Sequence, residues 1–169
     1  MKFLKKSPTL MLKTLNHKLA QLLMLMLPVV VTACSDSGCI GNSSSIPLAA
    51  FYDYDTGAAG SIGPVTIRGI GAPGDSCLVD NTTVNQVYLP LQASAGSSTF
   101  VFDFHDDELP PDTLTLRYEA VPYFHSSECG VMYLFNISGY DVTDHLIDSI
   151  ALPYQVINNE DKVTIKLYF

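Results

Sequence analysis

The stretch Thr113–Ala120 reads TLTLRYEA, and its apolar and polar side chains alternate without a break. One set is Leu114, Leu116, Tyr118 and Ala120; the other is Thr113, Thr115, Arg117 and Glu119. Side chains of a strand point alternately to its two faces, so a period of two indicates one buried and one wet face. The stretch therefore predicts a half-buried β-strand.

The same period recurs on both sides of this stretch. In STFVFDF (98–104) and KVTIKLYF (162–169) every second residue is apolar or aromatic, so these side chains lie on one face. VMYLFNI (131–137) is apolar on both faces, which is typical of a central strand. Four further strand-like stretches cover 46–54, 64–70, 84–91 and 146–154, separated by turn sequences such as GAPGDS, LPPDT and NNED.

No stretch after residue 34 has sustained helical periodicity. About eight short strands with regular turns predict an all-β fold, a single antiparallel β-sandwich, Ig-like or similar, over residues 46–169. Pro90 and Pro153 fall within strand-like runs, and proline is confined to edges and strand ends because it lacks an N–H. We expect both prolines at such positions.

The chain begins with a basic segment, and an apolar run from Leu19 to Val31 follows. This run is shorter than the roughly 20 residues that a membrane-spanning helix needs, and it is typical of a secretory signal. Val31-Thr32-Ala33-Cys34 resembles the bacterial lipoprotein box, in which the cysteine is lipidated and the chain is cut before it. We expect residues 1–33 to be removed, Cys34 to carry the lipid and 34–45 to be a flexible tether. The alternative is an ordinary cleaved signal with a chance cysteine.

These features predict a cell-envelope protein held by its lipid, most plausibly at the outer membrane of a Gram-negative bacterium. The formal net charge of the whole chain is −8, and all 17 acidic residues lie after Cys34. Only Arg68, Arg117, Lys162 and Lys166 balance them. Such a chain repels nucleic acid and anionic headgroups, which excludes a nucleic-acid partner.

Lipidation of Cys34 leaves Cys39, Cys77 and Cys129 in an oxidising compartment, where disulfides persist. Three cysteines allow one disulfide, and the sequence leaves the three pairings open. We prefer Cys39–Cys129, because Cys39 lies just before the first strand, where a disulfide ties the domain to its tether.

The sequence DFHDDELPPD carries the densest group of acids, Asp103, Asp106, Asp107, Glu108 and Asp112. Clustered carboxylates could bind Ca²⁺ through their oxygens, but the spacing of an EF-hand loop is absent. A hairpin loop with solvated acids is the preferred interpretation. Thr113 in DTL and Ser149 in DSI match a short acceptor pattern for protein O-glycosylation in Bacteroidota.

We find no catalytic motif. The three histidines after Cys34 lie in different segments, no zinc-ligand pairs are repeated, and no serine occupies a glycine-flanked elbow. A hydrolase built from scattered residues remains an alternative, because triads are defined by geometry.

The order of the lipobox, CIGNSSSIPLAAFYDYD, VNQVYLPL, YFHSSECGVMYLFNI and KVTIKLYF is similar to that in a family of Bacteroidota lipoproteins classified only as a domain of unknown function. The resemblance implies an envelope lipoprotein and supplies no catalytic residues or cofactor. Cys77 falls outside the matching stretches, which supports treating it as the unpaired cysteine. We expect a non-enzymatic accessory module that binds an outer-membrane protein. The alternative is glycan binding by aromatics such as Tyr52, Tyr54, Tyr123 and Tyr140.

Overall fold

A computed structural model describes residues 45–71, 75–127 and 129–169. The predicted signal peptide, the lipidation site Cys34 and the disulfide partner Cys39 therefore lie outside the described residues. Within the described ranges the chain forms strands and no helix, which confirms the all-β class. No helix there is long and apolar enough to cross a bilayer.

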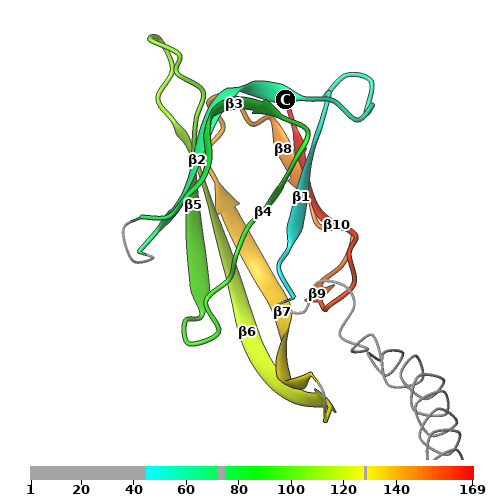
Figure 1. Cartoon of the computed structure of the whole chain (residues 1–169). Coiled ribbons are helices and arrows are strands. Elements are labelled where there is room, and N and C mark those ends of the chain that lie inside the picture. The colour runs from blue at the N-terminus through cyan, green and yellow to red at the C-terminus, as the bar shows by residue number, and fades with distance from the viewer. Residues whose placement is uncertain (1–44, 72–74, 128) are drawn as a thin grey trace, which may run out of the picture. The chain divides into compact units, whose positions relative to one another are not determined.

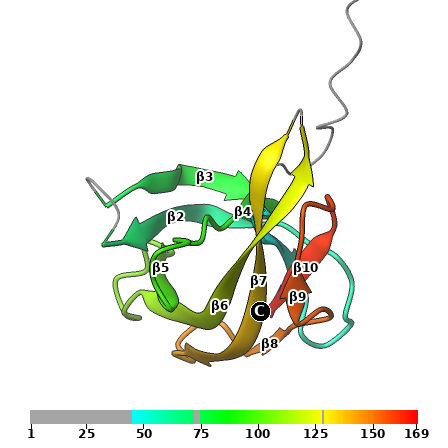
Figure 2. The ribbon, with the colours of Figure 1, turned by 90° about the horizontal axis from the view of Figure 1, so that it is seen from below.

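The strands form two sheets (Figure 1). The four-stranded sheet has the order β4 (Gln86–Tyr88), β1 (Leu48–Tyr52), β10 (Val163–Tyr168) and β8 (Ser149–Ala151). The six-stranded sheet has the order β3 (Cys77–Val84), β2 (Ile62–Ile70), β5 (Ser97–Asp103), β6 (Asp112–Ser126), β7 (Gly130–Val142) and β9 (Val156–Ile157). Viewed from below, the larger sheet curls into a half-barrel (Figure 2).

Alternating side chains from both sheets build one core. Phe51 of β1 and Leu167 of β10 belong to the same buried cluster as Phe102 of β5 and Leu116 of β6. For β5, β6 and β10 these are the faces that the period of two assigned to the interior, whereas β1 is buried from Leu48 to Phe51 without alternation. The alternation thus decides which side chains meet between the sheets.

The smaller sheet departs from the predicted antiparallel arrangement, because β1 and β10 pair in parallel. Their register runs from Leu48 opposite Val163 to Tyr52 opposite Tyr168, with a bulge after Leu48. At the bulge the backbone N–H of Leu48 donates to Thr164 Oγ1 at 3.1 Å, across 116 residues of sequence. Strands that pair across the two ends of the domain are not joined by a turn, so no local sequence pattern predicts their pairing.

Both prolines lie where they were expected. β4 and β8 are the two edges of the four-stranded sheet, and Pro90 and Pro153 each lie two residues beyond the end of one of them. Proline cannot continue the hydrogen-bond ladder, which is consistent with the short length of both edge strands, three residues each.

All eight predicted segments contain a strand, and the structure adds β3 and β9. The interpretation of 131–137 as a central strand is wrong in one respect. Val131 and Tyr133 of β7 are exposed, and only the two-residue β9 borders β7 on its outer side. The apolar character of this strand has a different cause, which the β6–β7 hairpin explains.

Candidate functional site

The β6–β7 hairpin is longer than the sheet that contains it. β5 pairs with β6 only as far as Arg117, and β9 pairs with β7 only at Phe135 and Asn136. Beyond these positions, within the described residues, β6 and β7 pair only with each other, down to Ser126 opposite Gly130. The hairpin therefore projects from the sandwich as a two-stranded ribbon (Figures 1 and 2).

One face of this ribbon is apolar and exposed. Phe124 is 69% exposed and lies opposite Val131, which is 63% exposed. Next to them Pro122 lies opposite Tyr133, which is 38% exposed. We call these four residues the tip face. Contiguous exposed apolar side chains of this kind mark interaction surfaces more often than single exposed residues do.

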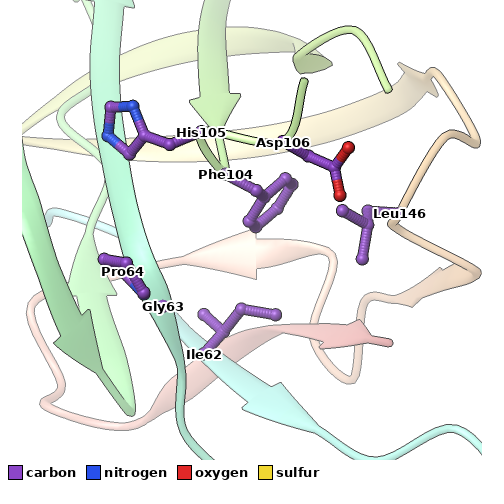
Figure 3. A pocket seen from close by; sticks show the side chains of 7 residues that line it. All are labelled: Ile62, Gly63, Pro64, Phe104, His105, Asp106 and Leu146. Carbon is purple, nitrogen blue, oxygen red and sulfur yellow. The ribbon is translucent and has the colours of Figure 1, made fainter. Parts of the chain in front are cut away.

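A small pocket lies at the other end of the domain, where the β5–β6 loop meets β2 (Figure 3). Its volume is about 230 Å³, and its lining includes Ile62, Pro64, Phe104, His105 and Leu146. Pockets that enclose metabolite-sized ligands are usually larger, about 300–1,000 Å³. This pocket therefore suits at most a very small ligand.

His105 is the polar group of this pocket with the most specific contacts. Its Nε2 lies 2.9 Å from the hydroxyl of Thr66, and its Nδ1 lies 3.8 Å from Asp103 Oδ1. The sequence of hydroxyl, imidazole and carboxylate is that of a hydrolytic triad. However, Thr66 is only 2% exposed and its oxygen accepts the N–H of Asn81 at 3.0 Å. The distance of 3.8 Å also exceeds that of a hydrogen bond, so the geometry favours a structural role.

Asp112 is the most highly coordinated carboxylate in the described part of the chain, and it is fully buried. It accepts the Thr143 hydroxyl at 2.7 Å and the backbone N–H groups of His145, Leu146 and Ile147 at 2.8–2.9 Å. Burial raises the pKa of this carboxyl, but the donated hydrogen bonds outweigh burial and leave the pKa below its ordinary value of 3.8. Asp112 thus fixes the connection between β7 and β8.

This role removes Asp112 from the predicted calcium ligands. Of the other four acids, Asp103 accepts the His105 N–H, and Asp106 accepts the N–H groups of Glu108 and Leu109. In the part of the chain that the structure describes, no three or more His, Cys, Asp and Glu side chains gather as metal ligands. The loop geometry matches the preferred interpretation of solvated turn acids, and the calcium site stays a prediction without an assembled ligand set.

The structure answers part of the question of how the cysteines pair. Cys77 is a free, exposed thiol, so neither of the two pairings that use it is formed. Cys129 lies in the turn of the β6–β7 hairpin, where its N–H donates to Ser126 Oγ. The preferred pairing with Cys39 stays a prediction.

The two glycosylation positions lie on different strands. Thr113 is half-buried within β6 and follows the buried Asp112, so a modifying enzyme has no access to that aspartate in the folded domain. Ser149 is the first residue of β8 and is half-buried. Both assignments stay predictions.

The four tyrosines named for glycan binding do not gather. Tyr123 pairs with Met132 near the hairpin turn, whereas Tyr140 pairs with Leu116 at the opposite end of the same ladder. Tyr52 ends β1, and Tyr54 lies in the turn after it. A tyrosine that the sequence reasoning missed, Tyr168, is the one that lies against Tyr52, with ring centroids 5.5 Å apart.

The tip face was also missed. A signal was present, because apolar and aromatic residues continue from Thr113–Ala120 through VPYF (121–124) and resume at Val131, beyond the length of the neighbouring strands. Such excess length indicates a hairpin that leaves its sheet.

Comparison with known proteins identifies the family of the chain. No curated protein and no solved structure matches it. A family model, described as a family of unknown function (DUF6452), matches residues 64–169. The match begins in β2 and includes most of the pocket lining, Asp112 and the whole β6–β7 hairpin, but not Ile62 of the pocket. Since it covers more than half of the chain, the chain belongs to this family of unknown function, DUF6452.

Proposed function

We propose that this chain is a lipid-anchored, non-enzymatic binding module of the cell envelope, and that it pairs with an outer-membrane protein through the edges of its β6–β7 hairpin. The anchor follows from the lipobox and the short apolar run before Cys34. The outer membrane of a Gram-negative bacterium is the proposed location, and Bacteroidota are the proposed lineage.

The single observation that supports this function best is the pair of open edges on the hairpin. Within the described residues, β6 from Ala120 to Ser126 and β7 from Val131 to Leu134 each have a neighbour on one side only. An unpaired edge offers N–H and C=O groups to a strand of another protein. The backbone provides affinity in such a complex, and the side chains of the edge select the partner.

The other sheet edges are poorly suited to pairing. β4, β8 and β9 are two or three residues long. β3 is longer, but three irregularities interrupt its register with β2. Short and bulged edges are the usual protection against unwanted pairing, which leaves the hairpin as the available edge.

The pocket supports the non-enzymatic part of the proposal. The Thr66 hydroxyl is buried and already accepts a backbone N–H, so a substrate has no path to it. A nucleophile needs both access and an activating base in hydrogen-bond reach. Thr66 has a base in reach, His105, but its hydroxyl is not accessible.

A photo-crosslinking residue placed at His125, an exposed position near the end of β6, tests the proposal in cells. The matched control places the same residue at Tyr54, which is also exposed but follows β1 at the other end. We expect a reproducible crosslink to one outer-membrane protein from position 125 and none from position 54. Equal capture from both positions, or no protein capture from an envelope-attached chain, contradicts the proposal.

Glycan binding is the second candidate, favoured by one observation. Tyr52 and Tyr168 lie side by side on the outer face of the four-stranded sheet, and Lys166 Nζ lies 4.8 Å from the centre of the Tyr52 ring. Sugar rings stack on such aromatic surfaces. Retention of a glycan on an array, lost in Tyr168→Ala and kept in Tyr54→Ala, supports this function. Absence of retention contradicts it.

A further inference from the structure

The domain begins at the end from which the hairpin projects. The described chain starts at Ser45, and β1 runs from there away from the hairpin end (Figure 1). The pairing agrees with the picture, because Leu48 lies opposite Val163, at the start of β10. β9, which precedes β10, pairs with Phe135 in the hairpin.

The position of Ser45 limits how far the hairpin end can move from the membrane. Cys34 and Ser45 are eleven residues apart in the sequence, a span of at most about 40 Å when fully extended. If Cys34 carries the lipid, as the proposed function requires, the hairpin end is the part of the domain held nearest to the bilayer. A short tether also raises the local concentration of this end at the membrane surface.

The hairpin and the loops at the opposite end of the domain differ in charge. The sequence from Val121 to Leu134 contains one acidic residue, Glu128, and no lysine or arginine. The opposite end carries the loop with Asp106, Asp107 and Glu108 and the turn that begins at Asp53, both at the top of Figure 1. Anionic headgroups repel the acidic loops at the opposite end. At the hairpin end the β9–β10 turn carries Glu160 and Asp161, and Lys162 forms an ion pair with Glu160. The hairpin itself is therefore the part that approaches the headgroups with least repulsion.

The tip face has the composition of a membrane-interface contact. Phe124 and Val131 supply exposed apolar surface, and Tyr133 beside them has an aromatic body with a polar hydroxyl. Tyrosine is enriched at membrane–water interfaces for this reason.

We propose that the tip face, Pro122, Phe124, Val131 and Tyr133, lies in the interface of the bilayer that holds the lipid anchor, and that this contact turns the acidic end away from the membrane. The inference rests on the anchor of the proposed function but concerns a different surface, the face of the hairpin and not its edges. A hairpin that rests on the bilayer by one face keeps its edges open in the membrane plane, where an outer-membrane protein can pair with them.

The chain contains no tryptophan, so a single substitution introduces a unique fluorescent probe. The experiment uses the full lipidated chain with Phe124→Trp, reconstituted in phosphatidylcholine vesicles with or without bromine on the acyl chains. The matched control is Tyr54→Trp, at a 57% exposed position at the opposite end. We expect blue-shifted emission and loss of most of it in brominated vesicles for the first variant, and unshifted, unquenched emission for the control.

Flotation of the vesicles separates failure of the anchor from failure of this inference. A chain that floats with the vesicles but shows no bromine quenching at position 124 overturns the inference and leaves the anchor intact. A chain that does not float overturns the anchor and this inference together. Emission at position 124 that is blue-shifted but not quenched by bromine shows that protein covers the tip face, which also overturns the inference. Because Phe124 is exposed, its variant is expected to unfold at the same denaturant concentration as the unmodified chain.

Discussion

The two halves of β6 belong to one continuous strand and have opposite surroundings. In the first half Leu114 and Leu116 are fully buried between the sheets. In the second half Phe124, on the strand that continues them, is mostly exposed. Alternation therefore defines the faces of a strand, whereas coverage of a face depends on how far the neighbouring strands extend, and β5 stops at the partner of Arg117.

The polar groups follow the same division. At the start of β6, Asp112 accepts four hydrogen bonds from the segment Thr143–Ile147 and orders it against the core. In the second half, near the hairpin turn, the Cys129 N–H donates to Ser126 Oγ. We expect the first half to determine the stability of the fold and the second half to be available for contacts with other molecules.

Asp112→Ala is expected to have the largest effect. It leaves the Thr143 hydroxyl and three backbone N–H groups buried without an acceptor, and each such group costs about 1–3 kcal/mol. We expect the free energy of unfolding to fall by about 4 kcal/mol, as measured by denaturant titration. The matched control is Asp107→Ala in the exposed β5–β6 loop, with an expected change below about 0.5 kcal/mol. Equal effects of the two substitutions would contradict the role of Asp112.

Leu116→Ala is expected to have the next largest effect on the free energy of unfolding. Leu116 is completely buried in the main core cluster, and its truncation removes apolar contacts and leaves a cavity. We expect a loss of about 3 kcal/mol in the free energy of unfolding, from the same titration. A loss below about 1 kcal/mol would show that the sheets close around the cavity more completely than this packing suggests.

The sequence predicted the strands well where a local pattern existed. The period of two predicted β5, β6 and β10, and Pro90 and Pro153 predicted that β4 and β8 end at the edges of a sheet. β3 was missed because CLVDNTTV has a run of polar residues and little alternation. The parallel β1–β10 pair was missed because it depends on contacts across the whole domain.

The candidate site was less predictable. Asp112 was grouped with its neighbouring acids, although it is in phase with Leu114, Leu116 and Tyr118 and therefore points inward. The period of two contained that information. The Thr66–His105 contact joins residues 39 positions apart on β2 and in the β5–β6 loop, and no local pattern predicts such a contact.

Acidification should remove part of the stability that Asp112 contributes at the start of β6. The pKa of Asp112 is lowered in the folded state, so its contribution is complete above the unfolded value near 3.8 and is lost as pH falls through the folded value. We expect the free energy of unfolding to decrease between pH 5 and pH 2, by less than in Asp112→Ala, because a protonated carboxyl still accepts some hydrogen bonds. Asp112→Asn is the control. It should show a smaller decrease over this range, and an identical decrease would assign the pH dependence to other carboxylates such as Asp53, whose pKa is also lowered, first by the Thr56 hydroxyl.

Phe124→Ser is expected to have the smallest effect on stability, so it gives the clearest contrast with Leu116→Ala. Both residues are on β6 and are large and apolar, but Phe124 packs against little of the described domain. We expect the free energy of unfolding to change by less than about 0.5 kcal/mol in the same titration. An exposed phenylalanine that contributes nothing to folding is what an interaction surface requires. A loss comparable to that of Leu116→Ala would instead show that the tip face is part of the core, and it would remove the basis for assigning it an external contact.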